Sequence, residues 1–229
     1  MYFKNRATAG KKLAEKLLKY QKDPVAVVAL SEGSIIVAAQ VAMRLHASLS
    51  ILLTEDIYLP GEREPIAAIT SAGTFTKNKM FSVGQLEELM MDYHNFVEEQ
   101  RLQSFHHLNM LMTNEGEIKK EYLRRHVVIL VSDGLINGFS LDVAYDFLKT
   151  VAIKKLVVAT PVASVKAVDR MHLVADDLYC LDVKPNYIST DHYYDDNFIP
   201  DHEKMYKIME RISVNWRVEP IRHSAKVNA

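Results

Sequence analysis

The chain has 229 residues, of which 48% are hydrophobic and 25% charged, and its formal net charge is -1. This composition is typical of a globular protein, and the charge balance does not favour nucleic acid or an anionic membrane as a partner. Cys180 is the only cysteine, which excludes an intramolecular disulfide and a thiolate zinc cluster and leads us to expect a cytoplasmic protein. The first residues lack the apolar stretch of a signal peptide, and no apolar run approaches the ~20 residues needed to cross a bilayer.

Strands and helices are expected to alternate through the first third of the chain, as in a parallel sheet with helices on both faces. The apolar patterns predict a helix over 8–20, a strand over 25–30, a helix over 34–45, and strands over 49–53 and 66–70. Ser34 is expected to cap the second of these helices. The polar segment over 54–61 ends in a Pro-Gly pair and is expected to be a loop.

The character of the sequence changes between residues 82 and 125. Ser82 and Gln85 form the pattern of a capping box, and apolar residues then recur at helical spacing to about residue 112. We expect one long helix, or a broken one, inserted between strands. Its methionines are of a type common at packing and partner surfaces, so a homodimer is expected.

The alternation resumes in the second half of the chain. After a strand over 127–131, the patterns predict a helix to about 150, a strand over 155–161, a helix over 164–172 and a short strand over 177–180. A loop over 182–200 precedes a helix over 201–214, and residues 215–229 are expected to be a flexible tail. Together these elements indicate a single domain over 1–214 with a helical insertion at about 82–125.

The stretch over 127–140, VVILVSDGLINGFS, carries the main functional signal. Its apolar start predicts a strand buried on both faces, and the glycine-bearing turn after it leads into a helical pattern from Leu141. This order places free backbone N–H groups and a positive dipole end around an anion, typically a phosphate. We call residues 134–140 the phosphate cradle, which consists of Gly134, Leu135, Ile136, Asn137, Gly138, Phe139 and Ser140.

Asp133 comes directly before the cradle, at the carboxyl end of the strand, where ligands bind in open α/β sheets. Its carboxylate is expected to bind sugar hydroxyls, so that Asp133 and the cradle together hold a sugar phosphate. The competing interpretations are an ordinary strand-to-helix turn for the cradle and a helix-capping role for Asp133.

This stretch resembles the signature with which type I phosphoribosyltransferases bind 5-phosphoribosyl 1-diphosphate (PRPP). That signature has two acidic residues, then Gly, a Thr-Gly pair and a further Thr or Ser. Asp133, Gly138 and Ser140 match it, whereas Ser132 replaces the first acid and Asn137 replaces the first Thr. The resemblance implies catalytic positions at Asp133 and Ser132, although Ser132 can bond a ribose hydroxyl without supplying charge.

The resemblance covers roughly residues 3–209 and implies an α/β, Rossmann-like fold with about five parallel strands and helices on both faces. The opening of a bacterial phosphoribosyltransferase subgroup is similar to Phe3, Arg6, Ala9, Gly10 and Leu13. Its late aromatic motif resembles Tyr193, Tyr194 and Phe198. Tyr193 and Tyr194 are therefore candidates for stacking on a base, the alternative being that they pack the loop onto the sheet.

The implied pyrophosphate side departs from the family. The loop after the first strand in that subgroup carries arginine where this chain has Glu32, within Ser31, Glu32, Gly33 and Ser34, and Glu55 and Asp56 replace a basic pair. Two like charges about 4 Å apart repel by about 4 kcal/mol at an effective dielectric constant near 20. We therefore expect this side to repel a diphosphate unless Mg²⁺ is bound, and whether these acids hold a metal or are solvated loop charges is left open.

Three functions are compatible with these features. The first is a phosphoribosyltransferase that uses PRPP, with Mg²⁺ as cofactor, and a nucleobase as acceptor. The second is a non-catalytic regulatory protein that binds PRPP or a nucleotide and has lost pyrophosphate handling. The third is a structural dimer module built on the inserted helix. In the first two, the expected partner is a small phosphorylated ribose ligand, with neither nucleic acid nor membrane involved.

Overall fold

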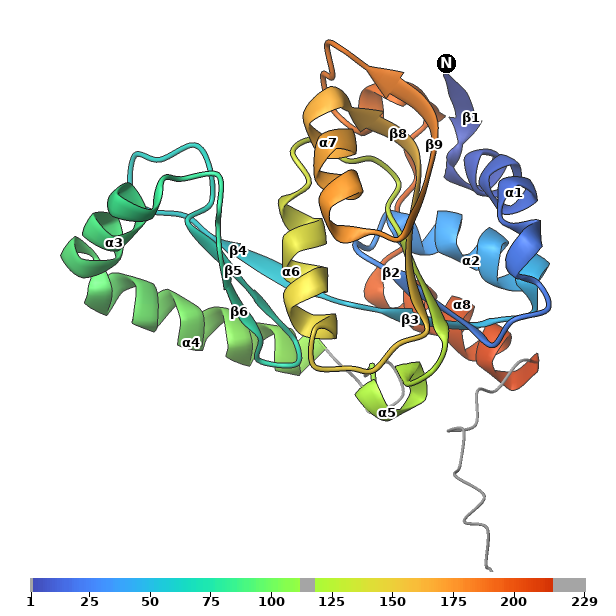
Figure 1. Ribbon diagram of the computed structural model, residues 1–229, viewed down its shortest axis with the longest axis horizontal. Helices are drawn as coiled ribbons and strands as arrows, with labels where there is room; N and C mark the ends of the chain where they lie inside the picture. The colour runs from blue at the N-terminus through green and yellow to red at the C-terminus, as the bar shows by residue number, and fades with distance from the viewer. Residues whose placement is uncertain (1, 112–117, 216–229) are drawn as a thin grey trace, which may run out of the picture.

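The computed structural model describes residues 2–111 and 118–215 (Figure 1). The helices are α1 (Arg6–Lys16), α2 (Ser34–Leu45), α3 (Val83–Asp92), α4 (His94–Leu111), α5 (Lys120–Leu123), α6 (Phe139–Leu148), α7 (Val165–Val174) and α8 (His202–Asn215). The strands are β1 (Phe3–Asn5), β2 (Val25–Ala29), β3 (Ser48–Ile51), β4 (Thr54–Ile57), β5 (Ala67–Thr70), β6 (Phe75–Lys77), β7 (Val127–Val131), β8 (Lys155–Ser164), β9 (Asp177–Lys184) and β10 (Tyr194–Asp196). The expected tail, apart from Asn215, lies outside the described residues.

Five parallel strands form the central sheet, in the order β3-β2-β7-β8-β9. This confirms the predicted α/β fold with a parallel sheet of about five strands. β8 runs beyond its expected end at Pro161, because the pairing with β9 passes over the proline, from Thr160 opposite Cys180 to Val162 opposite Asp182. Proline has no N–H to donate, so the ladder omits only that residue.

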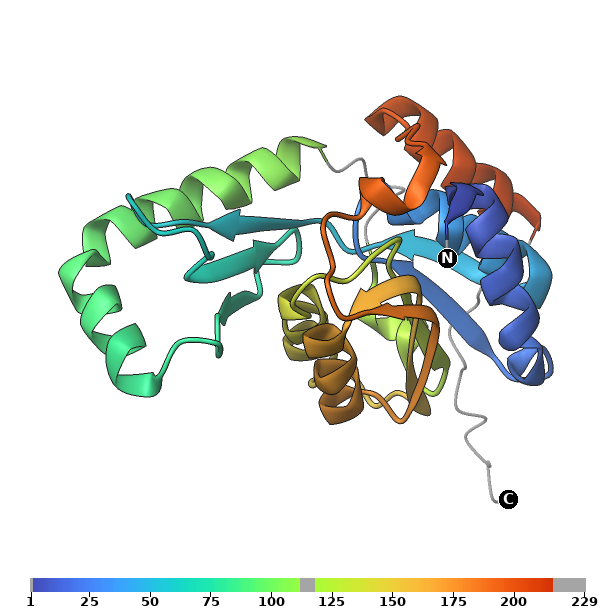
Figure 2. The same ribbon diagram turned by 90° about the horizontal axis from the view of Figure 1, so that it is seen from above.

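Helices cover both faces of the central sheet. Val25, Val27 and Ala29 pack into a core with α1, α2 and α8, whereas Ala26 and Val28 pack into a second core with α6 and α7. Figure 2 shows the two groups of helices on opposite sides of the sheet. Every residue of β2 and β7 is buried, which is why these strands are continuous apolar runs in the sequence.

An arm extends from the edge of the central sheet (Figures 1 and 2). We define the arm as residues 54–111, which form the antiparallel sheet β4-β5-β6 and helices α3 and α4. A small core within it contains Ile57, Ile66 and Val97. α3 begins with the expected capping box of Ser82 and Gln85, and the expected long helix is broken between α3 and α4.

The arm also corrects a prediction. The segment over 54–61 was expected to be a loop, but its first four residues form β4, which pairs antiparallel with β5. Only Ile57 of β4 is buried, so the strand has no apolar run that would reveal it. The part of the chain outside the central sheet therefore begins before the expected insertion at 82.

A pairing between β1, near the N-terminus, and β10, which precedes α8, brings the N-terminal segment to the edge of the sheet. β1 pairs in parallel with β10, with Phe3 opposite Tyr194 and Asn5 opposite Asp196. The Asn5 side chain accepts a hydrogen bond from the Thr8 backbone N–H at 2.9 Å and so caps α1. As a consequence, Arg6 is the first residue of α1 and lies next to the loops that follow the strands.

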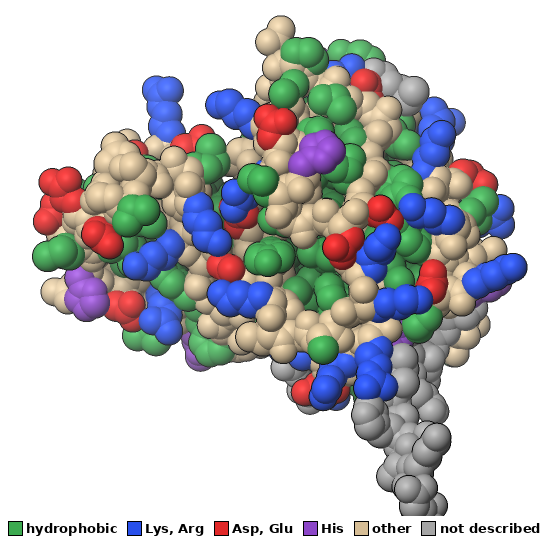
Figure 3. All heavy atoms as spheres, viewed as in Figure 1, with side chains coloured by type: hydrophobic (Ala, Val, Ile, Leu, Met, Phe, Trp, Pro, Cys, Tyr) green, Lys and Arg blue, Asp and Glu red, His purple; other side chains and the backbone are tan. Residues whose placement is uncertain are grey.

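The surface carries both signs of charge. On the face drawn in Figure 3, Lys and Arg side chains are interspersed with Asp and Glu, as the net charge of -1 leads one to expect. Within the described ranges, none of the helices is both long and apolar enough to span a membrane. The arm exposes Met91, Leu102 and Met110, and the homodimer expected from its methionines remains a prediction.

The first testable prediction concerns Asp177, which ties the edge of the sheet to the segment after α1. Its carboxylate accepts hydrogen bonds from Tyr20, from Lys155 at 2.9 Å and from Lys19 at 3.2 Å. The bonds from Tyr20 and Lys155 hold the pKa of this carboxyl below its ordinary value. We expect Asp177→Asn to lower the free energy of unfolding by about 1–2 kcal/mol at pH 7.

The same effect has a definite pH dependence. A carboxyl whose pKa is depressed by folding stabilises the protein above its unfolded pKa of about 4 and loses that contribution as the pH falls through the folded value. Urea unfolding of the native chain and Asp177→Asn should therefore differ most at pH 7 and by a smaller amount at about pH 3, and the difference should vanish only below the folded pKa. An equal difference at both pH values would contradict this account of Asp177.

Candidate functional site

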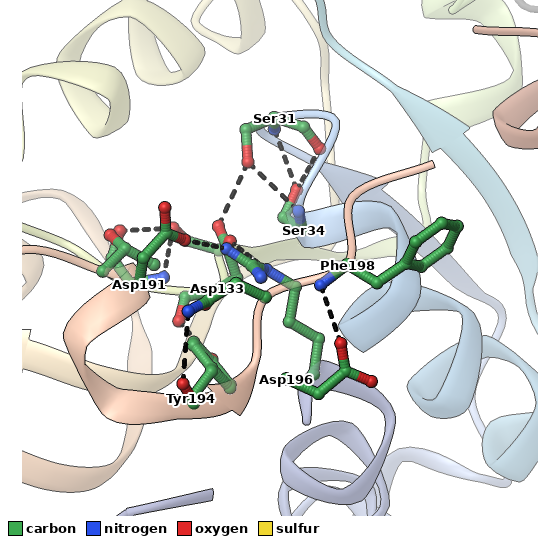
Figure 4. Close-up of polar contacts among 12 residues, drawn as sticks. Ser31, Ser34, Asp133, Asp191, Tyr194, Asp196 and Phe198 are labelled. Carbon is green, nitrogen blue, oxygen red and sulfur yellow. Dashed lines mark hydrogen bonds and ion pairs between the residues drawn. The ribbon is translucent and has the colours of Figure 1, made fainter. Parts of the chain in front are cut away.

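The candidate site lies at the carboxyl edge of the central sheet, where the loops after β2, β7 and β9 meet the start of α1 (Figure 4). Arg6 comes from α1 and Asp133 from the loop after β7. Asp191 comes from the segment between β9 and β10, residues 185–193, which we call the late loop. The site is therefore built from parts of the chain that are distant in sequence.

Arg6 is the centre of this cluster, and only 2% of it is exposed. Its Nε donates to Asp133 Oδ2 at 2.7 Å, and its Nη2 donates to Asp191 Oδ1 at 2.6 Å. The guanidinium lies over the ring of Tyr194, 4.8 Å from the centroid. Burial lowers the pKa of Arg6, but the charge of Asp133 and the bonds to both carboxylates outweigh burial and raise it, so the group is a permanent cation.

Protein donors engage both oxygens of the Asp133 carboxylate. Oδ2 accepts from Arg6, and Oδ1 accepts from the Ser31 hydroxyl at 3.2 Å. The Asp133 backbone carbonyl accepts from the Tyr194 hydroxyl at 2.5 Å. Because the Ser31 contact is long for a hydroxyl bond, Oδ1 is the oxygen that a ligand hydroxyl can share most readily.

The structure divides the predicted cradle into two sets of backbone N–H groups. The first set is already engaged: Gly134 N donates to the Ser132 hydroxyl at 3.2 Å, Leu135 N to Val162 O at 3.1 Å, and Phe139 N to the Asn137 side chain at 3.1 Å. The Ser132 hydroxyl in turn donates to Gly134 O at 2.9 Å. Ser132 therefore shapes the turn, and a role toward ribose is not shown.

The second set of N–H groups is free. Across the hydrogen bonds among described residues, the backbone N–H groups of Ile136, Asn137, Gly138 and Ser140 have no partner. Gly138 has φ 78°, a conformation that glycine adopts without strain, and it turns the chain into α6. Four free N–H groups at the start of a helix are the arrangement that binds an oxyanion.

The loop after β2 closes around its own side chains. The Ser34 hydroxyl donates to Ser31 O at 2.6 Å and accepts from Ser31 N at 2.8 Å. Ser34 is the first residue of α2 and Gly33 occupies the cap position, so the prediction of Ser34 as the cap was wrong. The reason is that the Ser34 hydroxyl is used within the loop. Glu32 Oε1 lies 3.2 Å from Nε2 of His202 in α8.

The other two acids lie on the arm. Glu55 Oε2 is 3.1 Å from Nδ1 of His107 in α4, and Asp56 lies beside Tyr58, whose hydroxyl is 3.5 Å from its carboxylate. Glu55 is thus occupied within the arm. Across residues 2–111 and 118–215, no group of three or more His, Cys, Asp or Glu side chains is placed to hold a metal ion.

Tyr193 and Tyr194 are 3% and 4% exposed. The Tyr194 ring packs against Phe3, with centroids 5.8 Å apart, and under the Arg6 guanidinium. Both residues thus pack the loop onto the sheet, which is the alternative that the sequence left open, and base stacking remains a prediction. Burial raises the pKa of the neighbouring Tyr187 to about 12.

Sequence reasoning missed the roles of Arg6 and Asp191. Arg6 belongs to the quoted opening, and it shares a helix face with Ala9, Gly10 and Leu13, all of which are buried. An arginine on the apolar face of a helix signals a buried partner, because an unpaired charge there is costly. For Asp191, one of several acids in an Asp-rich loop, no comparable signal exists.

Comparison with known proteins identifies the family. A family model described as the phosphoribosyl transferase domain matches residues 2–196, from the start of β1 to the end of β10. The chain therefore belongs to the phosphoribosyl transferase domain family. The match takes in Arg6, Asp133, the cradle and the late loop.

Individual relatives are distant. Two candidate phosphoribosyl transferases of Mycobacterium tuberculosis are each 27% identical to this chain over 190 residues, in matches that cover 78% of the chain and 40% of each relative. The chain thus spans less than half of their length. The crystal structure of TT1426 from Thermus thermophilus has the same fold, with a TM-score of 0.71, 24% identity, and coverage of 92% of this chain and 99% of that one.

The packing around Gly33 gives a second prediction. A Cβ on Gly33 would lie 2.4 Å from Asp133 Oδ2 and 3.1 Å from Arg6 Nε. We expect Gly33→Ala to displace this ion pair and to lower the free energy of unfolding by about 1–3 kcal/mol. Gly84 is the matched control, because a Cβ there meets nothing within 4 Å.

Urea unfolding of the two variants measures the difference. Gly84 lies in the exposed helix α3, so Gly84→Ala should leave stability unchanged or raise it by about 0.5–1 kcal/mol. Equal stability of Gly33→Ala and the native chain would show that the loop after β2 does not press on the ion pair.

Proposed function

We propose that this chain binds a ligand containing ribose 5-phosphate, either PRPP or a nucleotide, with the 5-phosphate on the free N–H groups of the cradle. The observation that carries the proposal is a set of four backbone N–H groups, at Ile136, Asn137, Gly138 and Ser140, that have no hydrogen-bond partner among the described residues. Membership of the phosphoribosyl transferase domain family supports the same ligand class. Backbone N–H groups can bind phosphate whatever side chains the neighbouring positions carry.

Asp133 is the proposed partner of the ribose hydroxyls. It directly precedes the cradle, and its Oδ1 has only the long contact with Ser31 to exchange. A carboxylate oxygen accepts more than one hydrogen bond, so a ribose hydroxyl can bind there while Oδ2 stays on Arg6. The ion pair with Arg6 keeps the carboxylate fixed in position for this contact.

Phosphoribosyl transfer is the reaction proposed for the family site. It would require stabilisation of a cationic ribose beside Asp133 and of a departing diphosphate. Mg²⁺ fits here only as an ion brought by the diphosphate, because no group of three or more His, Cys, Asp or Glu side chains in the described part of the chain is placed to hold it alone. Asp133 would contribute to its binding through Oδ1. When bound, the ion would neutralise the diphosphate charge.

Binding without transfer is the second proposal. It is favoured by the acid at Glu32, which lies in the loop after β2 and is paired with His202 rather than with a cation supplied for a diphosphate. A regulatory protein that reads nucleotide or PRPP concentration needs the cradle and does not need leaving-group stabilisation. A cytoplasmic location and a homodimer remain predictions under both proposals.

Calorimetry and an activity assay separate the two proposals. The ligands are ribose 5-phosphate, AMP, and PRPP with and without Mg²⁺, followed by measurement of PRPP consumption and pyrophosphate release over a panel of nucleobases. Turnover that is lost in Asp133→Ala supports transfer. Binding of AMP or ribose 5-phosphate without turnover supports the regulatory role. If no phosphorylated ribose binds, both proposals fail.

A third prediction tests the cradle directly with a variant that keeps the fold. Ser140→Asp adds a negative charge in the first turn of α6, which stabilises the helix by about 0.3–1 kcal/mol. The same charge repels a phosphate on the neighbouring N–H groups, so we expect affinity for ribose 5-phosphate to fall tenfold or more. Ser140→Asn introduces a side chain of nearly the same shape as aspartate but without the charge. Its affinity for ribose 5-phosphate should lie within about threefold of that of the native chain.

Affinities from calorimetry and melting temperatures from scanning calorimetry decide the outcome together. The expected result is an equal or raised melting temperature with weakened binding only in Ser140→Asp. Unchanged affinity in Ser140→Asp would place the phosphate somewhere other than the cradle.

A further inference from the structure

The two carboxylates on Arg6 differ in how firmly they are held. The Asp133 side chain is 9% exposed and the Asp191 side chain is 58% exposed, although both lie within 2.7 Å of a guanidinium nitrogen. A solvent-exposed carboxylate is easily rehydrated, so its release costs far less than that of a buried one. Asp133 is therefore a fixed anchor for Arg6, and Asp191 is an exchangeable partner.

The third nitrogen of the guanidinium supports this interpretation. Arg6 Nη1 is buried and has no hydrogen-bond partner in the described structure. A buried donor left unpaired costs free energy comparable to a lost hydrogen bond. The arrangement with Asp191 thus leaves donor capacity unused on a cation at the site, and a ligand with more acceptor oxygens than one carboxylate can use it.

The late loop that carries Asp191 also packs on Gly134, the first residue of the cradle. The Tyr187 hydroxyl and Thr190 Oγ1 lie 2.9 Å apart, and a Cβ built on Gly134 would come within 2.3 Å and 2.7 Å of them. These two side chains therefore pack directly on the Gly134 backbone. Movement of the late loop would uncover Gly134 and the Arg6 edge together, because Thr190 and Asp191 are adjacent.

We propose that Asp191 occupies a second oxyanion subsite on Arg6, and that a ligand oxyanion binds by displacing it and opening the late loop. The proposal rests on the proposed function, since the ligand's 5-phosphate is held in the cradle. In this proposal Arg6 supplies the positive charge for the second oxyanion, because the loop after β2 carries an acid, Glu32, at the corresponding place. Exchange of one anion for another at Arg6 keeps its charge balanced throughout.

The part of the ligand that would replace Asp191 is an oxyanion within reach of Asp133, on the side of the ribose away from the 5-phosphate. Two kinds of ligand carry such a group: PRPP, with the diphosphate on C1, and a nucleotide whose base bears a carboxylate. Two ligand pairs separate them, because each pair differs chiefly in that group. The pairs are ribose 5-phosphate against PRPP, and uridine 5′-monophosphate against orotidine 5′-monophosphate.

The fourth prediction concerns Asp191→Ala, with Asp195→Ala as its control. Asp195 is exposed on the neighbouring strand β10, so the control removes the same charge without touching Arg6. Asp191→Ala should raise the affinity for the ligand that carries the second oxyanion about tenfold, which corresponds to about 1.4 kcal/mol. The affinity for the other ligand of the pair should change by less than about twofold. Asp195→Ala should change the affinities for both ligands of a pair equally.

Calorimetry on the full chain gives outcomes that each decide a point. A gain with PRPP identifies the diphosphate as the occupant, and a gain with orotidine 5′-monophosphate identifies a base carboxylate. If ribose 5-phosphate binds and neither ratio changes in Asp191→Ala, the second subsite is refuted while the proposed function stands. If ribose 5-phosphate does not bind the native chain, the proposed function fails first.

A second variant tests the cation itself. Arg6→Lys keeps a positive charge but offers a single donor head, which cannot bridge Asp133 and a second oxyanion in the same geometry. It should lower the preference for the doubly anionic ligand about tenfold relative to its partner in the pair. The proposal would be overturned if the affinity ratio between the doubly anionic ligand and the other ligand of its pair were the same in the native chain, Arg6→Lys and Asp191→Ala.

Discussion

The ion pair between Arg6 and Asp133 is the interaction on which the geometry of this site depends. It joins the start of α1 to the loop after β7, across 127 residues of sequence, in a place where Arg6 is 2% exposed. A buried pair of this kind adds little net stability, but loss of one partner leaves an uncompensated charge that costs about 3–5 kcal/mol. The pair therefore fixes the position of Asp133 rather than the stability of the fold.

Two kinds of binding group meet at this pair. The cradle offers backbone N–H groups, which are set by the turn at Gly138 and do not depend on charged side chains. Beside the cradle, Arg6 pairs with Asp133 on one side and with Asp191 on the other. Under the proposed function, this division lets backbone groups hold the phosphate, while Arg6 supplies a positive charge close to Asp133.

The sequence was sufficient for the central sheet and insufficient for much of the site. Strands β2 and β7 are buried on both faces and are recognisable as apolar runs, whereas β4 is half-exposed and β1 and β10 are three residues each, paired only with one another. Asp133 and the cradle follow from a local order of strand, glycine turn and helix. The partners of Arg6 lie 127 and 185 residues away, and no local pattern encodes such contacts.

The most direct test of the account is an NMR titration of the ¹⁵N-labelled chain with ribose 5-phosphate. We expect the largest changes in amide chemical shift at Ile136, Asn137, Gly138 and Ser140. A smaller change is expected at the Arg6 Nε–H signal, because the Asp133 carboxylate accepts a ribose hydroxyl. Saturable shifts confined to another surface, such as the hollow between Lys11 and Arg44, or no shifts at all, would contradict it.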